Sequence, residues 1–221
     1  MQKIHIKAAK STNHNEILNF LREEFYPFEH LTLAHSIPGV TEDDEAFTMS
    51  HLHSQNGIVL MTFADENCEK LVGVLIAGAI SSKNITNENE PIKTEKWNDI
   101  FNFLIFIEKR ANILQKFNID KYLQIHAIAV KNEVRGQKIA QKLIKKCFNI
   151  AENNYEVVCM DCTSTFSIKV AENLEMQAVS EIYYEEYNKI IGEEKFAAQE
   201  PHTVIITFVK IMCNNKIEIV I

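Results

Sequence analysis

The chain has 221 residues, with 23 Lys and Arg against 30 Asp and Glu, and its formal net charge is −7. Hydrophobic residues make up 46% of it and there are only six Gly and four Pro, which excludes a disordered or collagen-like chain and fits one globular domain over residues 1–221. The longest apolar run, residues 71–80, is about half of the ~20 residues that a membrane-spanning helix needs, and the first residues lack the apolar core of a secretory signal. The acidic balance also argues against nucleic acid as a partner. We therefore expect a cytoplasmic protein that binds neither a membrane nor nucleic acid.

The hydrophobic periodicity of the first half predicts strands mixed with helices. The expected elements are a strand over 2–9, a helix over 11–26, an irregular connection over 27–39, a short helix over 42–54, an antiparallel hairpin over 57–80, a loop over 81–90 and a helix that ends near 117.

The second half is more regular. The expected elements are a strand over 122–130, a helix over 134–154, a strand over 155–162, a helix over 164–174, a strand over 177–187 and a β-rich tail over 202–221. Strands that alternate with helices predict the α/β class, and the early hairpin predicts a mixed sheet.

The cysteines and histidines do not predict a disulfide framework or a metal site. Five scattered Cys are typical of free thiols. Cys159 and Cys162 form a C-x-x-C, but in a strand this spacing sends the two side chains to opposite faces. His51 and His53 are two apart on a predicted helix and do not share a face, so we interpret them as surface or packing residues. No metal is expected.

The junction after Val130 is the most informative site. A strand ends there, a basic turn with one glycine follows, and an amphipathic helix begins. A helix N-terminus offers unpaired N–H groups and a positive dipole end, which together hold phosphate, and Arg135 and Lys138 would add charge. A solvated basic connection is the alternative. The turn lacks both G-x-x-x-x-G-K-[ST] and G-x-G-x-x-G.

This turn resembles the acyl-CoA pyrophosphate loop of the GCN5-related N-acetyltransferase (GNAT) superfamily, [RQ]-x-x-G-x-[GA]. Lys138 stands where the signature has glycine, and we expect it to adopt helical backbone angles and still donate its N–H. The resemblance implies a single-domain GNAT fold, a mixed twisted sheet flanked by helices, whose central strands splay to bind acetyl-CoA in the half over about 121–187. The cofactor-binding residues that it implies are Ile128, Ala129, Val130, Arg135, Gly136, Gln137, Lys138, Ile139, Ala140 and Ser164.

Three further segments resemble the insect arylalkylamine N-acetyltransferases, of the dopamine N-acetyltransferase type. The family's F-F-x-x-E-P-L is similar to residues 25–31, its C-[ST]-S-x-[YF]-S is similar to residues 162–167, and a Tyr-rich strand followed by Gly192 to Phe196 and Pro201-His202 completes the pattern. The match covers roughly residues 3–210 and is weakest over 32–95. It implies acetyl transfer from acetyl-CoA to a small arylalkylamine such as dopamine, serotonin, tryptamine or octopamine.

The mechanism must deprotonate the amine, because an alkylamine with a pKa of ~10 is an ammonium ion at neutral pH. The resemblance implies Glu29 as the general base, through a bound water, and a backbone N–H near Ala129 or Val130 as oxyanion donor. The tyrosine with which many relatives protonate the leaving thiolate is replaced by Ala171. The arylalkylamine branch implies Thr163 and Ser167 for that role, although both also fit a helix start.

Alternatives remain open. An acidic protein could instead acetylate agmatine or a polyamine, and the substitution at Lys138 together with the absent tyrosine would fit a degenerate member that binds acyl-CoA without turnover. A peptide substrate is also possible. We expect a monomer in which the cofactor binds before the amine.

Overall fold

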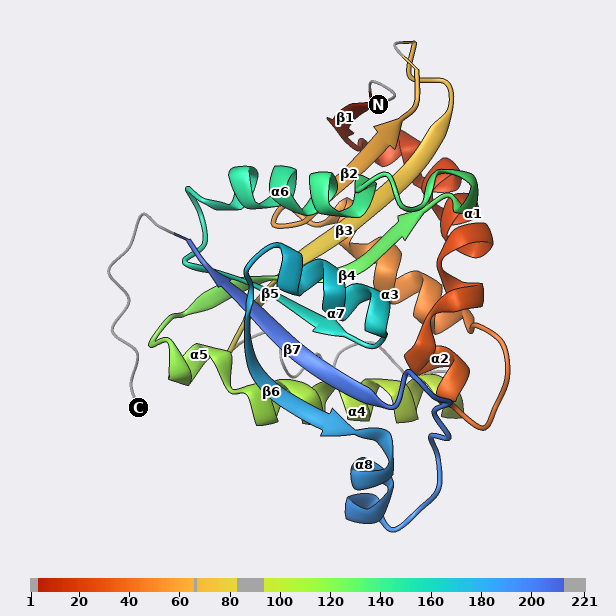
Figure 1. Cartoon of the computed structure of the whole chain (residues 1–221), viewed down its shortest axis with the longest axis vertical. Helices are drawn as coiled ribbons and strands as arrows, with labels where there is room; N and C mark the ends of the chain where they lie inside the picture. The colour runs from red at the N-terminus through yellow and green to blue at the C-terminus, as the bar shows by residue number, and fades with distance from the viewer. Residues whose placement is uncertain (1–3, 66, 83–93, 213–221) are drawn as a thin grey trace.

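The structure is a computed structural model, which describes residues 4–65, 67–82 and 94–212. One mixed sheet of seven strands crosses this part of the chain, in the order β1-β2-β3-β4-β5-β7-β6 (Figure 1). The strands are β1 His5–Ala8, β2 Ile58–Phe63, β3 Leu71–Ser81, β4 Lys121–Val130, β5 Val157–Cys162, β6 Gln177–Tyr183 and β7 Val204–Ile211. Only β4 and β5 run parallel to each other; the other neighbouring pairs are antiparallel.

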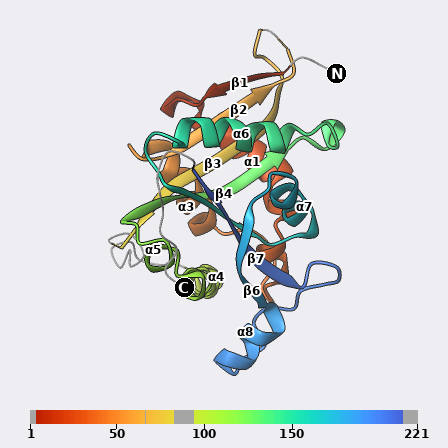
Figure 2. The same cartoon turned by 60° about the vertical axis from the view of Figure 1, so that its left-hand side comes forward.

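Helices cover both faces of the sheet. The described helices are η1 Ser11–Asn13, α1 His14–Glu24, η2 Tyr26–Phe28, α2 His30–Ala34, α3 Glu42–His53, α4 Glu95–Ala111, α5 Ile113–Lys116, η3 Asn132–Val134, α6 Ile139–Ala151, α7 Thr165–Asn173 and α8 Tyr184–Ile191. Figure 2 shows α6 on one face of β1 to β4, with α1 and α3 on the other. The mixed α/β architecture predicted from the sequence is confirmed.

The core lies on both sides of the sheet. On the α6 face, Leu123 and Ile125 of β4 pack with Leu143 and Cys147 of the helix. The helix sits close because Gly73 of β3 has no side chain: a Cβ there would lie 3.2 Å from Ile139 Cγ2. On the other face, α1 and α3 pack against β2, β3 and β4. The position of β4 between these two cores matters for the site.

The strand β4 contains a bulge. Ile76 of β3 pairs with Ala127 and Ala77 pairs with Ile125, so His126 has no partner on β3. An extra residue of this kind bends a strand and disturbs its ladder. The last residue of β4 that pairs with β5 is Ile125, opposite Met160. The two parallel strands therefore separate where the bulge begins, and Figure 1 shows them diverging from there. The splayed central strands predicted from the sequence are confirmed.

The strand predicted over 177–187 is partly wrong. The strand β6 ends at Tyr183, and residues from Tyr184 onward form α8. Tyr184 and Tyr187 are both buried, and at a spacing of three they share one helix face. The helix ends at Gly192, whose φ of 74° is a left-handed C-cap that glycine adopts without strain.

Three boundaries also differ from the predictions. The segment over 27–39 is not wholly irregular, because it contains α2. The long helix expected to end near 117 is broken at Asn112, which has a φ of 49° and separates α4 from α5. The helix expected over 134–154 begins at Ile139, after η3 and the turn. The loop over 83–90, Cys213 and the end of the predicted tail lie outside the described residues.

The buried cysteines agree with the sequence analysis. Cys147, Cys159 and Cys162 are free thiols. Cys159 packs in the core beside α4 and α5 while Cys162 packs on the α6 face, so the C-x-x-C side chains do point apart. None of the helices among residues 4–65, 67–82 and 94–212 is long and apolar enough to cross a membrane.

Candidate active site

Glu29 lies between η2 and α2 and caps the latter. Its carboxylate accepts hydrogen bonds from the backbone N–H of Leu31, at 3.0 Å, and of Thr32, at 2.6 Å. The residue is half-buried, with extended backbone angles. Because glutamate is not a preferred N-cap, this short helix could not be predicted from capping rules.

Thr163 follows β5 and completes the surroundings of this carboxylate. Its hydroxyl donates to Glu29 Oε1 at 3.0 Å, which joins two residues 134 positions apart. The structure therefore brings two of the predicted catalytic residues into contact. An ionised carboxylate has about four lone-pair positions, and three of them now hold donors. One position is left for a water or a substrate proton.

Ser164 and Ser167 form a capping box at the start of α7. The Ser167 N–H donates to Ser164 Oγ at 3.1 Å, and the Ser167 hydroxyl donates to the Ser164 carbonyl at 2.9 Å. Both serines thus lie beside Thr163, with hydroxyls engaged in the helix start. Ala171 of α7, at the usual position of the tyrosine, is fully buried in the core on the α6 face.

The turn before α6 presents a row of unpaired amides. Gly136 has a φ of 80° and Lys138 a φ of 62°. Within the described chain, no acceptor is found for the backbone N–H groups of residues 136–141. A run of free amides at the N-terminus of a thirteen-residue helix is suited to bind phosphate. We expected helical backbone angles for Lys138, but the residue is left-handed. It occupies the position where the signature has glycine, the residue that adopts such angles without strain.

Arg135 connects this turn to the segment that carries Glu29. Its Nε donates to the Val130 carbonyl at 3.0 Å, and its guanidinium lies 3.4 Å from Glu24 Oε2. The guanidinium carbon is also 4.8 Å from the centre of the Phe28 ring. The predicted cofactor loop and the predicted catalytic glutamate are therefore neighbours in space.

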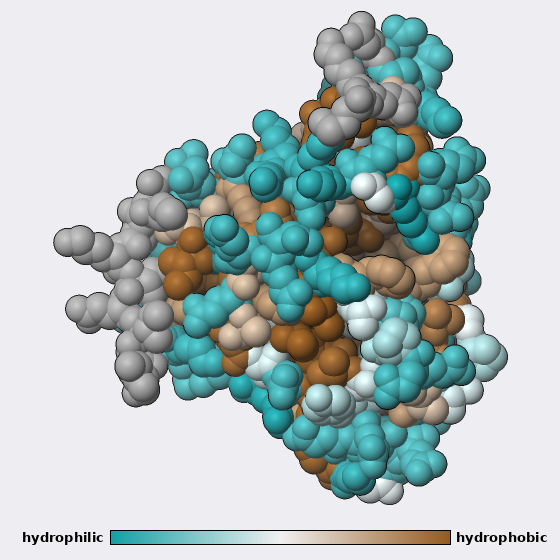
Figure 3. All heavy atoms as spheres, viewed as in Figure 1, coloured by the Kyte–Doolittle hydropathy of each residue, from teal (hydrophilic) through white to brown (hydrophobic). Residues whose placement is uncertain are grey.

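The open edge of β4 lies between these parts. Ile128 and Val130 are half-buried, whereas Ala129 is buried against the α1 face. The Lys131 N–H bonds the Val72 carbonyl of β3, and backbone groups alternate along an antiparallel strand. We infer that the amide of Ala129 also faces β3, while those of Ile128 and Val130 face the gap toward β5. Figure 3 shows this face hollowed between the end of β4 and α7, with apolar residues on the floor.

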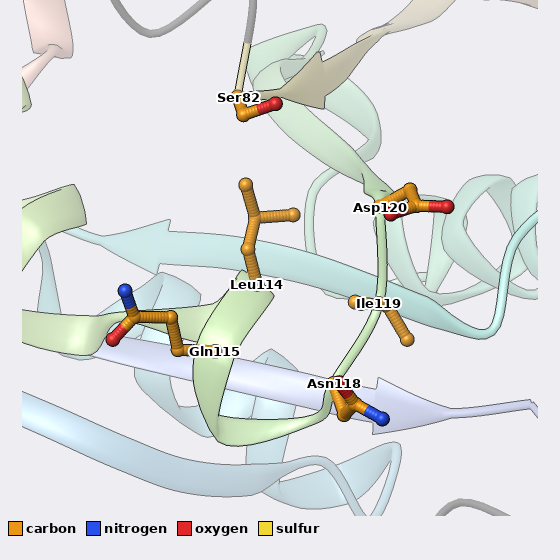
Figure 4. A pocket seen from close by; sticks show the side chains of 6 residues that line it. All are labelled: Ser82, Leu114, Gln115, Asn118, Ile119 and Asp120. Carbon is orange, nitrogen blue, oxygen red and sulfur yellow. The ribbon is translucent and has the colours of Figure 1, made fainter.

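A hollow of about 310 Å³ opens beside Glu29, and its lining residues are His30, Leu33, Ala34, Ala197, Ala198, Gln199, Glu200, Pro201 and His202. The rings of His30 and His202 stack at 3.7 Å, and His202 Nδ1 accepts the Thr165 N–H at 3.2 Å. Burial, followed by the neighbouring His202, lowers the pKa of His30. Figure 4 shows another hollow, of about 230 Å³, on the α5 side; its lining residues are Ser82, Leu114, Gln115, Asn118, Ile119 and Asp120.

The sequence analysis missed Lys96. Its side chain is 2% exposed, and its ammonium donates to the Thr32 carbonyl at 3.0 Å and to the Gly39 carbonyl. A signal was present, since Lys96 shares a helical spacing with the buried Ile100, Phe103 and Ile107 of α4. A lysine on the apolar stripe of a helix indicates a buried partner.

The parallel strands β4 and β5 separate next to a turn with free amides. This is the arrangement expected of the GNAT superfamily, which the sequence resembles. The Acetyltransferase (GNAT) family model matches residues 15–176, and the chain belongs to this family, whose members are acyltransferases. No curated protein matches the chain.

Solved structures support the same conclusion. A mosquito arylalkylamine N-acetyltransferase like 5b is 28% identical, with a TM-score of 0.87 over 95% of this chain and 100% of that one. A Drosophila melanogaster polyamine N-acetyltransferase, which forms N-acetylagmatine, is 22% identical, with a TM-score of 0.85 over 95% and 100% of the two chains. Arabidopsis thaliana NAA60, solved with acetyl-CoA, is 11% identical, with a TM-score of 0.57 over 95% and 99%. The first structure confirms the resemblance to insect arylalkylamine N-acetyltransferases, and the other two share the fold.

Proposed function

We propose that this acyltransferase transfers the acetyl group of acetyl-CoA to the primary amine of a small arylalkylamine. The observation that carries the proposal is the contact between Glu29 and Thr163 beside the open edge of β4. The Glu29 carboxylate also lies near the turn with the free amides, because Arg135 of that turn contacts the ring of Phe28, the residue before Glu29. This arrangement supports a general base next to a cofactor-binding turn.

The residues present fit acetyl-CoA. Its phosphates match the free N–H groups of residues 136–141, and the N–H groups of Ile128 and Val130 face the gap. When bound, acetyl-CoA supplies an acetyl thioester as the acyl donor. Lys138 keeps its N–H in the turn, so the missing glycine does not remove a donor.

The chain's own groups then move the protons. Glu29, with one free lone-pair position, would take a proton from the substrate ammonium through a water, while Thr163 and two backbone amides fix its orientation. The Val130 N–H faces the gap and would donate to the developing oxyanion. Thr163 and Ser167 remain the proposed sources of the thiolate proton.

Agmatine or a polyamine is a second candidate for the amine. The net charge of −7 and the likeness to a structure that forms N-acetylagmatine favour it. An aliphatic dication would depend more strongly on ionic strength than an aromatic monoamine, because exposed charge pairs are screened by salt. Measuring KM at low and high salt for tryptamine and for agmatine would separate the two.

The test is thiol release from acetyl-CoA over a panel of arylalkylamines and aliphatic amines. Glu29→Gln should lower kcat by on the order of 100-fold, since the amide cannot accept a proton, while acetyl-CoA binding measured by calorimetry stays within about twofold. Glu23→Gln, an exposed substitution on α1, is the matched control. Tight acetyl-CoA binding with no turnover of any amine would contradict the proposal and indicate a protein that only binds acyl-CoA.

A further inference from the structure

The first turn of α4 holds a buried cation that the chemistry above does not use. Lys96 exposes 2% of its surface, and both of its described partners are carbonyl oxygens and not carboxylates. Burying an ammonium is costly unless its charge is compensated. Burial lowers the pKa of Lys96, and the charges of Asp44 and then Glu29 oppose that effect. The compensating charge therefore includes the proposed base.

Two hydrogen bonds connect Lys96 to that base through one residue. The Lys96 ammonium donates to the Thr32 carbonyl, while the Thr32 N–H donates to Glu29 Oε2 at 2.6 Å. A bond to the Gly39 carbonyl attaches the chain beyond α2 to the same ammonium. Thr32, whose N–H orients Glu29, is thus held at its carbonyl by Lys96 of α4.

The charge of Lys96 also distinguishes it from the other groups that interact electrostatically with Glu29. These groups are His30 on α2, Asp44 on α3, Lys96 on α4 and Tyr184 on α8. His30 has a lowered pKa and is neutral at pH 7, Asp44 would repel the carboxylate, and Tyr184 is a buried phenol with a raised pKa. Lys96 is the cation of the set.

We propose that Lys96 is a positioning residue for Glu29: it anchors Thr32, whose N–H holds the carboxylate, and its charge favours the ionised form of that carboxylate. This inference rests on the proposed role of Glu29 as general base. A positive charge near a carboxylate stabilises the ionised state, and removal of the charge lets the carboxylate bind a proton at higher pH. Loss of Lys96 should therefore move the acidic limb of the pH–rate profile upward.

The experiment compares Lys96→Met, Lys96→Gln and Lys96→Arg in the full chain. Lys96→Met removes both the positive charge and the hydrogen-bond donors. Lys96→Gln removes the charge but keeps a donor, and Lys96→Arg keeps the charge and the donors. Lys116→Met is the matched control. Lys116 also donates to a backbone carbonyl, that of Val179, but it lies on α5 and has no described contact with Glu29. If Lys96→Met does not fold, Lys96→Gln provides the measurement.

The first readout needs no activity. In protein labelled with ¹³C in glutamate carboxyls, the Glu29 signal is assigned by its absence in Glu29→Gln and is titrated with pH. The titration curve of Glu29 should move toward higher pH in Lys96→Met and Lys96→Gln and return in Lys96→Arg. Equal midpoints in wild type and Lys96→Gln would overturn the inference even if the wild type acetylates amines.

The second readout is kinetic. Lys96→Gln should lower kcat at neutral pH by about tenfold or more through misplacement of the base, with the KM for acetyl-CoA unchanged and the acidic limb displaced upward. Lys116→Met should behave as wild type in both. If the wild type turns over no amine, the proposed function is wrong, but the titration still decides whether Lys96 acts on Glu29. The two proposals can therefore fail separately.

Discussion

Lys138 carries backbone strain in the turn before α6. Its φ of 62° places an L-residue in the left-handed region, where the side chain crowds the backbone. Glu175, just after the end of α7, has a φ of 55° and carries the same kind of strain. The backbone is therefore strained next to the N-terminus of α6 and next to the C-terminus of α7.

Lys138→Gly should stabilise the fold. Removing the side chain relieves the left-handed strain, partly offset by the greater freedom of glycine in the unfolded chain, so we expect a gain of up to about 1 kcal/mol in the free energy of unfolding. Urea denaturation measures it. Lys145→Gly, within α6, is the control and should lose about 1 kcal/mol. A loss at Lys138 as large as the loss at Lys145 would contradict this account.

At this scale the sequence could predict individual residues better than their contacts. Glu29, Thr163 and Ser167 were identified by resemblance, and the first two do touch. The pairing itself could not be derived, because it joins a loop after α1 to the end of β5. The burial of Lys96 had a signal in its helical spacing, but its partners could not be predicted, because they are backbone carbonyls, which leave no trace in residue types.

At the scale of elements, the bulge of β4 decides where the sheet opens. Leu123 and Ile125 face α6, whereas His126 and Ala127 both lie toward α1 and α3, where His126 stacks on His51 at 4.2 Å. Ile128 then faces α6 again. The bulge thus absorbs one residue without reversing the faces of the strand on either side.

Deletion of His126 should therefore close the gap without unfolding the protein. The remaining residues of β4 keep their faces, but a regular strand loses the bend that separates it from β5. We expect a folded variant by circular dichroism that binds acetyl-CoA at least about tenfold more weakly by calorimetry. Deletion of Ile128 is the control, because it reverses the faces beyond it and should prevent folding. Unchanged acetyl-CoA affinity after loss of His126 would show that the bulge does not make the opening.

Element types were predictable where one period dominated. The alternation of β4 and the 3.6-residue pattern of α6 gave the correct elements. The residues after Tyr183 were misassigned because YYEEY fits alternation as well as a helix, and only the burial of Tyr184 and Tyr187 on one face decides between them. The bulge has no signal of this kind, since an extra residue in an apolar strand changes no residue type.

At the scale of the whole molecule, two half-buried neutral histidines, His51 and His126, set the response to acid. Burial lowers the pKa of His51 to about 4 and holds the pKa of His126 well below its usual value, and the Nε2 atoms of both are buried without a hydrogen-bond partner in the described chain. Phe47 packs edge-on against both rings. The folded protein cannot protonate this pair at pH values where the unfolded chain can.

Stability should fall as the pH is lowered from about 6.5 toward 4, because the unfolded state then binds more protons than the folded one. For His51 the shift from 6.5 to about 4 corresponds to ~3 kcal/mol. Raised pKa values of Asp161 and Glu108 act in the opposite direction over the same range. The comparison of wild type with His51→Phe cancels those carboxyl groups, which are common to both.

The measurement is urea denaturation at pH 7 and pH 4.5. The loss of unfolding free energy between the two should be smaller in His51→Phe than in wild type by about 2–3 kcal/mol. His53→Phe is the control, since His53 is exposed at the end of the same helix. The same loss in wild type and His51→Phe would mean that this histidine does not determine the acid response.

The separation of β4 from β5 also bears on aggregation. Unpaired strand edges at the border of a sheet recruit strands of other chains, and proteins must protect them. Here the unpaired edge lies in the interior of the sheet and narrows to an ordinary strand pair at Ile125 and Met160. A foreign strand could not pair along its length, because there is no room for it at the narrow end. The protein can therefore keep free backbone groups for a small ligand without offering a template for association.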